Sequence, residues 1–497
     1  MLTSRSAPLL LLCLPALVAC AHGSTFRCEA QGGAAWSEYR SKHFVVDTDA
    51  PAERAARLVS LLETLQLLDM KALAGDELEL PGHLRVVALA RDSEFHDLAG
   101  PDVDGYFRQQ GQFGEPTIVI PMSAVEQRPY VLAHELAHHL SAYLFPDQPR
   151  WFTEGLAEFV QTLAERPPEP KAAFTGSHMI HLVKAAPHSV GGVPANAQGW
   201  SGSIVPIPVR ELLAWSGKED REVPGLYHAS SWLLYHWLWN QRGAQLSDFQ
   251  KRLSGGEPPA AAWLAAFPEY NPANPAALAP LDAALDRYRR EMRFATFGVE
   301  GTADGSFVQR PFPPAEAHLL LVAVRANWPD QPVARKALLR SQMDEALRED
   351  PRNPLAATFS AEPQPKPDPE KFRSAAAQAP QDFRAWLLLS DAVQGAEKEA
   401  ALRKAAQLNA ESSRAQNNLA WLLVTSDRAR EALPFANRAF DLAPWDPVVV
   451  DTLAEVAARL GQCTQALQLE ARAVSMRRAD ESLRKRQADV HKRCPPS

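Results

Sequence analysis

Two histidines and a glutamate stand together in the first third of the chain, in the pattern His134-Glu135-Leu136-Ala137-His138. Residues four apart share one face of a helix, so the imidazoles of His134 and His138 can bind a single ion. Glu135 lies about 100° further round the helix, beside the ion rather than on it. The pattern therefore predicts a metal site with Glu135 as a general base.

A hydrolytic zinc site usually takes three protein ligands and leaves a fourth position for water. The third ligand can come from a second apolar-periodic helix, which starts near Trp151 after a turn marked by Pro146 and Pro149. We assign Glu154 as this ligand, and Glu158 as the acceptor of a ring N–H from a ligand histidine. The reverse assignment of the two glutamates stays open.

The HExxH pattern followed by WFTEGLAEFV (151–160) resembles the gluzincins, and is similar in particular to the peptidase-MA-like family related to the aminopeptidase and thermolysin groups. The resemblance covers roughly residues 36–240. It implies a zinc peptidase in which Glu154 binds the metal. It also implies that an edge strand between Gly105 and Ile120 pairs with an extended substrate, although a plain sheet edge fits these residues equally well.

The expected reaction is hydrolysis of a peptide bond in a peptide or protein substrate. Zinc held by His134, His138 and Glu154 would acidify its bound water, and Glu135 would carry the proton to the leaving amine. The Gly-x-Met-Glu-Asn motif of the aminopeptidases does not occur in the sequence, which favours an endopeptidase. The rival hypothesis is a non-catalytic exported scaffold that binds partners through helical repeats, with a vestigial or structural metal site.

An aromatic-rich helix is expected over residues 223–240. Such a helix is first of all a core element. Gluzincins commonly direct a tyrosine or histidine from a later helix at the developing oxyanion. By that resemblance Tyr227 is our candidate donor, and His228 is the alternative.

The N-terminus predicts export. Arg5 precedes an apolar run over 9–18, which is too short to span a bilayer, and Leu17-Val18-Ala19-Cys20 resembles a bacterial lipobox. We expect a protein of the bacterial cell envelope, attached to the membrane only through a lipid on Cys20; an ordinary signal peptide cut near Ala21 is the alternative. In an oxidising compartment Cys463 and Cys494 can pair.

The elements that would support the site alternate between strands and helices. Strands are expected at 44–46 and 84–89, a helix at 51–74 with Gly75 as its stop, and paired strands within 105–121. The balance of 59 acidic and 52 basic residues gives a net charge of −7 and no sign of a nucleic-acid partner.

A repeat with a period of 34 residues marks the C-terminal part. Leu419-Ala420 recurs as Leu453-Ala454, Ala432 as Ala466, and Ala439 as Ala473. This is the tetratricopeptide period, in which small residues let paired helices approach closely. Such an array either presents a concave surface to a protein partner or buttresses the enzyme.

The fold class expected is α+β: a small N-terminal mixed-sheet lobe and a helical zincin lobe, followed by an all-α tetratricopeptide-like domain. The 497 residues are too many for one core. The expected segments are a signal peptide (1–19), a tether (20–35), the metallopeptidase domain (36–297), a connector (298–314), a helical segment with a degenerate repeat (315–360), a Pro-rich linker (361–369) and the repeats (370–490).

Overall fold

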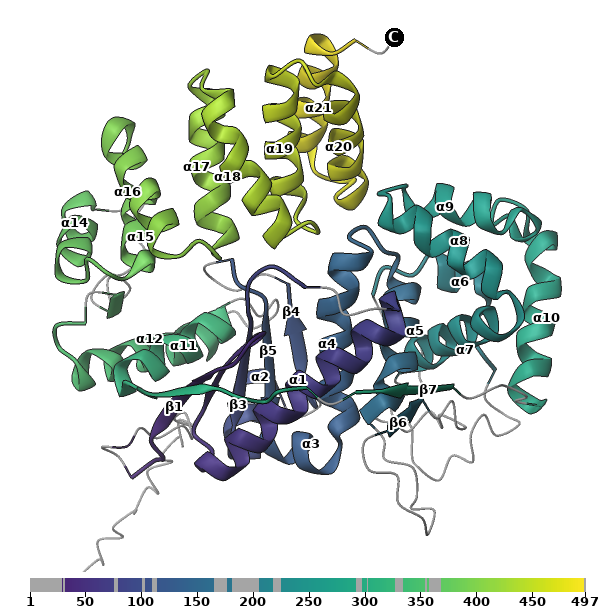
Figure 1. Ribbon diagram of the computed structural model, residues 1–497, viewed down its shortest axis with the longest axis horizontal. Coiled ribbons are helices and arrows are strands. Elements are labelled where there is room, and N and C mark those ends of the chain that lie inside the picture. Colours follow the sequence, from purple (N-terminus) through teal and green to yellow (C-terminus); the bar gives the residue numbers. More distant parts are fainter. Residues whose placement is uncertain are drawn as a thin grey trace, which may run out of the picture.

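The computed structural model describes residues 29, 32–75, 79–100, 103–109, 114–164, 177–180, 205–217, 225–291, 297–301, 303–326, 334–353, 355–356 and 368–495. They form mostly helices, with a small mixed sheet near the N-terminal end and paired helices at the C-terminal end (Figure 1). The leader, Cys20 and Cys28 lie outside the described residues, so lipidation stays a prediction. None of the described helices has the length and apolar character needed to span a bilayer.

Six strands form the N-terminal sheet in the order β4-β5-β3-β2-β1-β8. The central strands β2, β3 and β5 run parallel and are almost wholly buried, as strands covered on both faces are. The outer pairs are antiparallel. The strands predicted at 44–46, 84–89 and within 105–121 are confirmed. The bounds are β1 Trp36–Arg40, β2 Phe44–Thr48, β3 Leu84–Leu89, β4 Tyr106–Arg108, β5 Thr117–Pro121 and β8 Val308–Phe312.

The segment 298–314, expected as a connector, instead contains two strands. β7 (Phe297–Glu300) pairs with β6 (Ser177–Ile180), and β8 adds to the edge of the sheet beside β1. Glu38 of β1 lies opposite Arg310 of β8, and their side chains form an ion pair of 2.6 Å. β8 has no apolar periodicity in the sequence, because its side chains are mostly exposed and backbone pairing with β1 holds it in the sheet.

Helices cover both faces of the sheet. On one face α1 (Ala52–Ala74) packs with α4, and Gly75 ends it in the left-handed conformation with φ 83°, so the predicted helix and its stop are confirmed. On the other face lie α2 (Asp92–Ala99) and α11 (Pro314–Ala326). α11 buries Ala317, Leu321 and Val324 against the sheet, so part of the segment expected to hold a degenerate repeat completes the sheet layer.

A helical lobe follows β5 along the chain. Its core is aromatic, and the predicted core role of the helix within 223–240 is confirmed by the burial of most of α7. The elements are α3 Met122–Gln127, α4 Pro129–Leu144, α5 Arg150–Val160, α6 Val209–Leu213, α7 Leu226–Gln241, α8 Gly243–Ser254, α9 Pro259–Ala266 and α10 Pro275–Glu291, with 3₁₀ turns η2 Gln161–Ala164 and η4 Pro268–Tyr270.

The C-terminal helices repeat in pairs. α19 starts 34 residues after α17, and α20 starts 34 residues after α18. The small residues predicted to bring paired helices together, among them Ala420, Ala454 and Ala466, are fully buried. The helices are α12 Ala334–Glu349, α14 Pro369–Gln378, α15 Phe383–Ala392, α16 Gly395–Leu408, α17 Ser413–Thr425, α18 Ala429–Leu442, α19 Pro447–Arg459, α20 Cys463–Met476 and α21 Glu481–Arg493.

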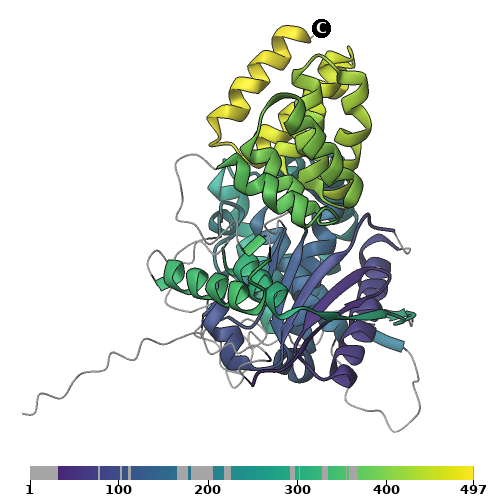
Figure 2. The ribbon, with the colours of Figure 1, turned by 90° about the vertical axis from the view of Figure 1, so that its left-hand side faces the viewer.

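This repeat array stands directly on the N-terminal half of the molecule (Figure 2). Ala142 of α4 packs with Ala439, Ala443, Trp445 and Val449 of the array in one buried apolar cluster. The array therefore packs directly against α4, the helix that carries the HExxH pattern, although the two are far apart in the sequence.

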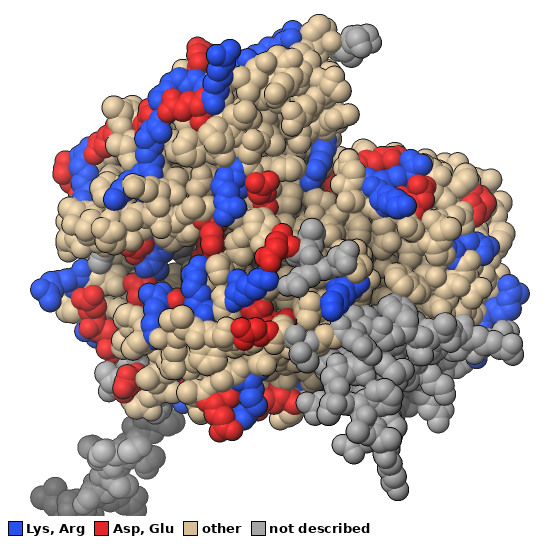
Figure 3. All heavy atoms as spheres, in the orientation of Figure 1, with Lys and Arg blue, Asp and Glu red and all other residues tan. Residues whose placement is uncertain are grey.

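The cysteine pair and the surface charges complete the description of the array. Cys463 and Cys494, which the sequence left as a possible pair, form a disulfide that ties the start of α20 to the end of α21. On the face shown in Figure 3, acidic and basic side chains of the described residues are interspersed, with no extended patch of one sign.

Candidate metal centre

α4 carries the two histidines of the HExxH pattern. The helix begins with Pro129 at its first position, where a backbone N–H would have no helical partner anyway. His134 and His138 lie one turn apart and bring their Nε2 atoms to 3.0 Å of each other. The two rings are thus close enough to share one ion.

α5 places Glu154 against both rings. Its Oε2 atom lies 3.4 Å from Nε2 of His134 and 3.5 Å from Nε2 of His138. Ligand atoms 2.0–2.1 Å from a tetrahedral zinc ion lie about 3.3 Å from one another. The three separations therefore match one face of such a tetrahedron. Among the described residues these three form the one group of metal-ligating side chains with this spacing, and they fit a divalent ion with an open coordination position.

Burial and charge oppose each other in this cluster. Burial raises the pKa of Glu154, but three imidazoles and Arg150 together hold the pKa well below its ordinary range. Burial lowers the pKa of His134, yet three nearby carboxylates raise it to about 9. Burial lowers the pKa of His138 to about 3, with positive neighbours adding to the effect. A metal ion would take the place of the proton on His134, because only deprotonated imidazoles bind metal.

Glu135 lies in the same cleft as the ligand set, beside the sheet edge. Burial raises the pKa of its carboxyl group to about 7, and the backbone N–H of Phe107 in β4 donates a hydrogen bond to that group. β4 is the terminal strand of the sheet, and Gly105, Phe107 and Gln109 line the cleft. The edge strand expected along the cleft therefore also positions the general-base candidate.

Glu158 lies one turn beyond Glu154 and is buried. Its Oε1 atom faces Nδ1 of His134 at 3.9 Å, on the opposite side of the ring from the ligand atom, and its Oε2 atom accepts a hydrogen bond from Gln161. Glu154 reaches the Nε2 atoms and Glu158 faces the far nitrogen, so the geometry favours Glu154 as the ligand and Glu158 as the outer partner.

Tyr227 and His228 occupy the first turn of α7, and their side chains take different directions. The Tyr227 hydroxyl donates to Oε1 of Glu211 at 2.6 Å, and its ring stacks on Trp215. His228 lines the cleft, and its Nε2 atom lies 3.3 Å from Oε2 of Glu154. His228 therefore faces the cleft and Tyr227 does not line it, while the oxyanion role of either residue stays a prediction. Periodicity does not separate two adjacent residues, whereas the packing of Trp215 against Tyr227 does.

Arg150 belongs to this cluster, although its sequence position was not singled out. Its guanidinium lies 2.7 Å from Oε1 of Glu154, one turn along α5, and 5.6 Å from the centre of the Trp215 ring. The i,i+4 spacing from Arg150 to Glu154 is a signal that could have found it. The contact leaves Oε2 of Glu154 to face the histidines.

Gly155 explains how α5 comes so close to α7. A Cβ atom at Gly155 would lie 2.5 Å from the carbonyl oxygen of Ser231 and 2.9 Å from Cβ of Tyr235. The glycine that follows Glu154 thus allows helix contact at the backbone level, which brings His228 to the metal ligands.

The cluster opens into a cleft of about 640 Å³. Its walls come from β4, α4, the α4–α5 loop, α5 and α7, and also from the repeat array through Trp445, Pro447, Met476 and Arg477. Nothing in local sequence marks these four residues, because they lie about 300 positions after the HExxH pattern and reach it only through tertiary packing.

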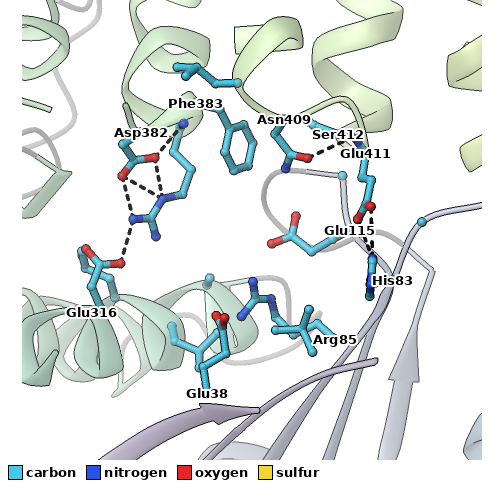
Figure 4. Close-up of a pocket in the computed structure, with 18 of the residues that line it drawn as sticks. Glu38, His83, Arg85, Glu115, Glu316, Asp382, Phe383, Asn409, Glu411 and Ser412 are labelled. Atoms are coloured by element: carbon cyan, nitrogen blue, oxygen red, sulfur yellow. Dashed lines mark hydrogen bonds and ion pairs between the residues drawn. The ribbon is translucent and has the colours of Figure 1, made fainter. Parts of the chain in front are cut away.

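A larger cavity of about 960 Å³ lies between the sheet and helices α15 to α17 (Figure 4). Its charged side chains meet one another: Arg384 contacts Asp382 and Glu316 at 2.7 Å each, and His83 contacts Glu411 at 2.9 Å. The described residues that line it form no group of metal-ligating spacing. We therefore place the candidate active site in the smaller cleft.

Comparison with known proteins leaves the family open. No protein-family model matches the chain, and no curated protein matches it. Among solved structures, a thermophilic TPR protein of Thermus thermophilus is similar at 20% sequence identity and a TM-score of 0.27, over 35% of this chain and 98% of that one. The assignment of helix pairs rests on their own spacing and packing.

Proposed function

We propose that the protein is a zinc-dependent endopeptidase whose metal is held by His134, His138 and Glu154. The observation that carries the proposal is the convergence of three ligand atoms at tetrahedral spacing, with Glu135 beside them in an open cleft. A set of two histidines and one carboxylate with an open position is typical of catalytic zinc, whereas structural zinc is closed by four protein ligands.

Zinc bound at this site would supply Lewis-acid chemistry, lowering the pKa of a water molecule and polarising the substrate carbonyl. Glu135 accepts the proton of the attacking water on its carboxylate as the new C–O bond forms. It then returns that proton to the leaving nitrogen as the C–N bond breaks. His228 shares the negative charge of the oxyanion by donating a hydrogen bond.

The substrate backbone is held by β4. As the terminal strand of the sheet it pairs with β5 on one side, and its neighbourhood, through Gly105, Phe107 and Gln109, lines the cleft in which an extended peptide would lie. Phe107 of this strand contacts Glu135, so a peptide paired there would run past the general base.

Metal analysis and peptide hydrolysis test this proposal together. We expect the purified mature protein to bind one zinc ion and the His134→Ala variant to bind none. We expect Glu135→Gln to keep the metal while peptide hydrolysis falls by at least about 100-fold, since general acid–base catalysis contributes that much or more. Glu126→Gln, a change at an exposed glutamate paired with Arg54, is the matched control. Equal hydrolysis by the parent and Glu135→Gln proteins would remove the enzyme claim and leave the scaffold hypothesis.

We also propose export and lipid attachment through Cys20. The disulfide between Cys463 and Cys494 supports an oxidising compartment. Cell fractionation of the parent and Cys20→Ala proteins tests the anchor: we expect the variant to leave the membrane fraction, and an unchanged distribution would contradict lipidation.

A further inference from the structure

One wall of the metal cleft belongs to the repeat array. Trp445 lies between α18 and α19, Pro447 begins α19, and Met476 and Arg477 lie at the end of α20. These residues come from the helix pair α19–α20 and the loop that precedes it, and the others that line the cleft come from the N-terminal half of the molecule.

This wall is attached to the helix that carries the histidines. The Tyr143 hydroxyl of α4 donates to the carbonyl oxygen of Leu442 at 3.2 Å, and its ring meets the Trp445 ring edge-on at 4.5 Å between centroids. His139, next to His138, is buried and also contacts Trp445. The face of α4 that carries His139 and Tyr143 thus packs against the wall, next to the face that carries the two histidines of the cluster.

A second attachment lies in the loop between the two metal-pattern helices. Asp147 accepts a hydrogen bond from Ser475 of α20 at 2.6 Å. Burial raises the pKa of Asp147, and the carboxyl group is occupied by that contact. This hydrogen bond therefore holds the last turn of α20, which carries Met476, beside the cleft.

Two partly exposed arginines line the cleft, together with the acidic residues Glu135, Asp147 and Glu154. Arg477 is 53% exposed and lies 4.0 Å from Asp480, at the outer limit of an ion pair. Arg150 is 47% exposed and lies on the other side, beside Glu154. Trp445, Pro447 and Met476 add an apolar surface next to Arg477. An extended chain that follows β4 would meet this combination of cation and apolar surface on the opposite wall.

We propose that the repeat array forms the specificity wall of the cleft and that Arg477 binds a carboxylate of the peptide substrate. The inference rests on the proposed peptidase function. A guanidinium recognises carboxylates by paired, charge-assisted hydrogen bonds. The carboxylate is either an acidic side chain near the scissile bond or the C-terminus of a short peptide. The cleft volume of about 640 Å³ suits a short extended segment.

Quenched fluorogenic peptides, compared in matched pairs, test the proposal on the full mature zinc-loaded protein. The pairs differ by Glu against Gln at each position around the scissile bond, or by a free against an amidated C-terminus. The proteins are the parent, Arg477→Glu, Arg477→Lys and the control Arg478→Glu, which changes the neighbouring exposed arginine outside the cleft wall. We expect the parent to favour the carboxylate member of one pair by about two- to fivefold in kcat/KM, as for a single accessible ion pair.

We expect Arg477→Glu to abolish or reverse that preference, Arg477→Lys to keep part of it, and Arg478→Glu to keep all of it. Preference in the Glu/Gln pairs identifies a side-chain carboxylate, and preference in the terminal pair identifies a C-terminus. An Arg477→Glu protein that keeps the parental preference, or a parent that shows none, overturns the inference while peptide hydrolysis itself stands.

Peptide binding, measured without turnover, tests the specificity wall separately from the proposed peptidase activity. Fluorescence anisotropy with the same labelled peptides on the Glu135→Gln protein, with and without Arg477→Glu, needs no turnover. If the parent hydrolyses no peptide but the carboxylate preference in binding depends on Arg477, the peptidase proposal falls and the specificity wall stands. If no peptide binds, the specificity wall falls as well.

Discussion

The metal cleft and the repeat array both bury polar side chains, but they arrange these side chains differently. In the cleft, the Nε2 atoms of His134, His138 and His228 all lie within 3.5 Å of one oxygen of Glu154. In the array, Asp451 pairs with Arg486 and Glu455 with Arg459. In the array each of these acids lies against one base, whereas in the cleft several ring nitrogens converge on one carboxylate oxygen, an arrangement also found around a bound metal ion. This contrast is the basis of the proposal that the cleft holds a metal ion.

Removing Glu154 should have the largest effect on the cleft. In the Glu154→Ala protein we expect zinc affinity to fall by at least about 100-fold, because even outer-shell partners of a metal contribute 10–100-fold. Competition with a chromogenic chelator measures this. Glu63→Gln, which alters a buried glutamate paired with His43 away from the site, should keep full affinity. Unchanged affinity in Glu154→Ala would mean that Glu158 is the ligand.

Breaking the disulfide should act on the array and spare the cleft. The bond closes a stretch of 31 residues, so Cys463→Ser combined with Cys494→Ser should lower the free energy of unfolding by about 2–4 kcal/mol. Guanidinium denaturation of the variant and parent measures the loss. Zinc affinity should stay the same, and a parallel loss of zinc would show that the two regions do not behave separately.

A methyl group at Gly155 should disturb the contact that aligns the cleft. Since a Cβ atom there would meet the Ser231 carbonyl at 2.5 Å, we expect Gly155→Ala to cost about 1–3 kcal/mol of stability and to weaken zinc binding. Thermal unfolding and chelator competition measure both effects. Gly243→Ala is the control, because a Cβ atom at Gly243 meets nothing within 4 Å. A stable Gly155→Ala protein with normal zinc affinity would show that α5 and α7 have room to move apart.

The buried acid Glu470 should give the array a pH dependence of its own. Burial, with the charge of Asp451 added, raises the pKa of Glu470 from 4.5 to about 8. The folded state therefore favours the protonated form. Its contribution is fully present below pH 4.5 and is lost as the pH rises through about 8, at up to about 1.4 kcal/mol per pH unit. Denaturation midpoints between pH 5 and 8 should fall with pH, and Glu470→Gln should flatten the slope. An equal slope in both proteins would assign it to other groups.

Several features of the molecule can be predicted from short stretches of its sequence. The spacing of His134 and His138 places them together on any helix, and Glu154 follows on the next helix after a turn too short to carry it far. The 34-residue period likewise locates the helix pairs α17–α18 and α19–α20. Strand β8 is different, because five mostly exposed residues show no apolar pattern and are held by pairing with β1.

Contacts that are local in sequence, such as one helical turn or one repeat, follow from the geometry of the chain itself, and so the cluster of His134, His138 and Glu154 and the repeats could be inferred before any coordinates. Which of Tyr227 and His228 faces the ligands, and which part of the array closes the cleft, depend on how whole helices pack. The Trp215 ring stacks on the Tyr227 ring, and the Tyr143 ring packs edge-on against the Trp445 ring. These arrangements are determined by packing between surfaces that are far apart in the sequence, and the periodicity of a single segment does not indicate them.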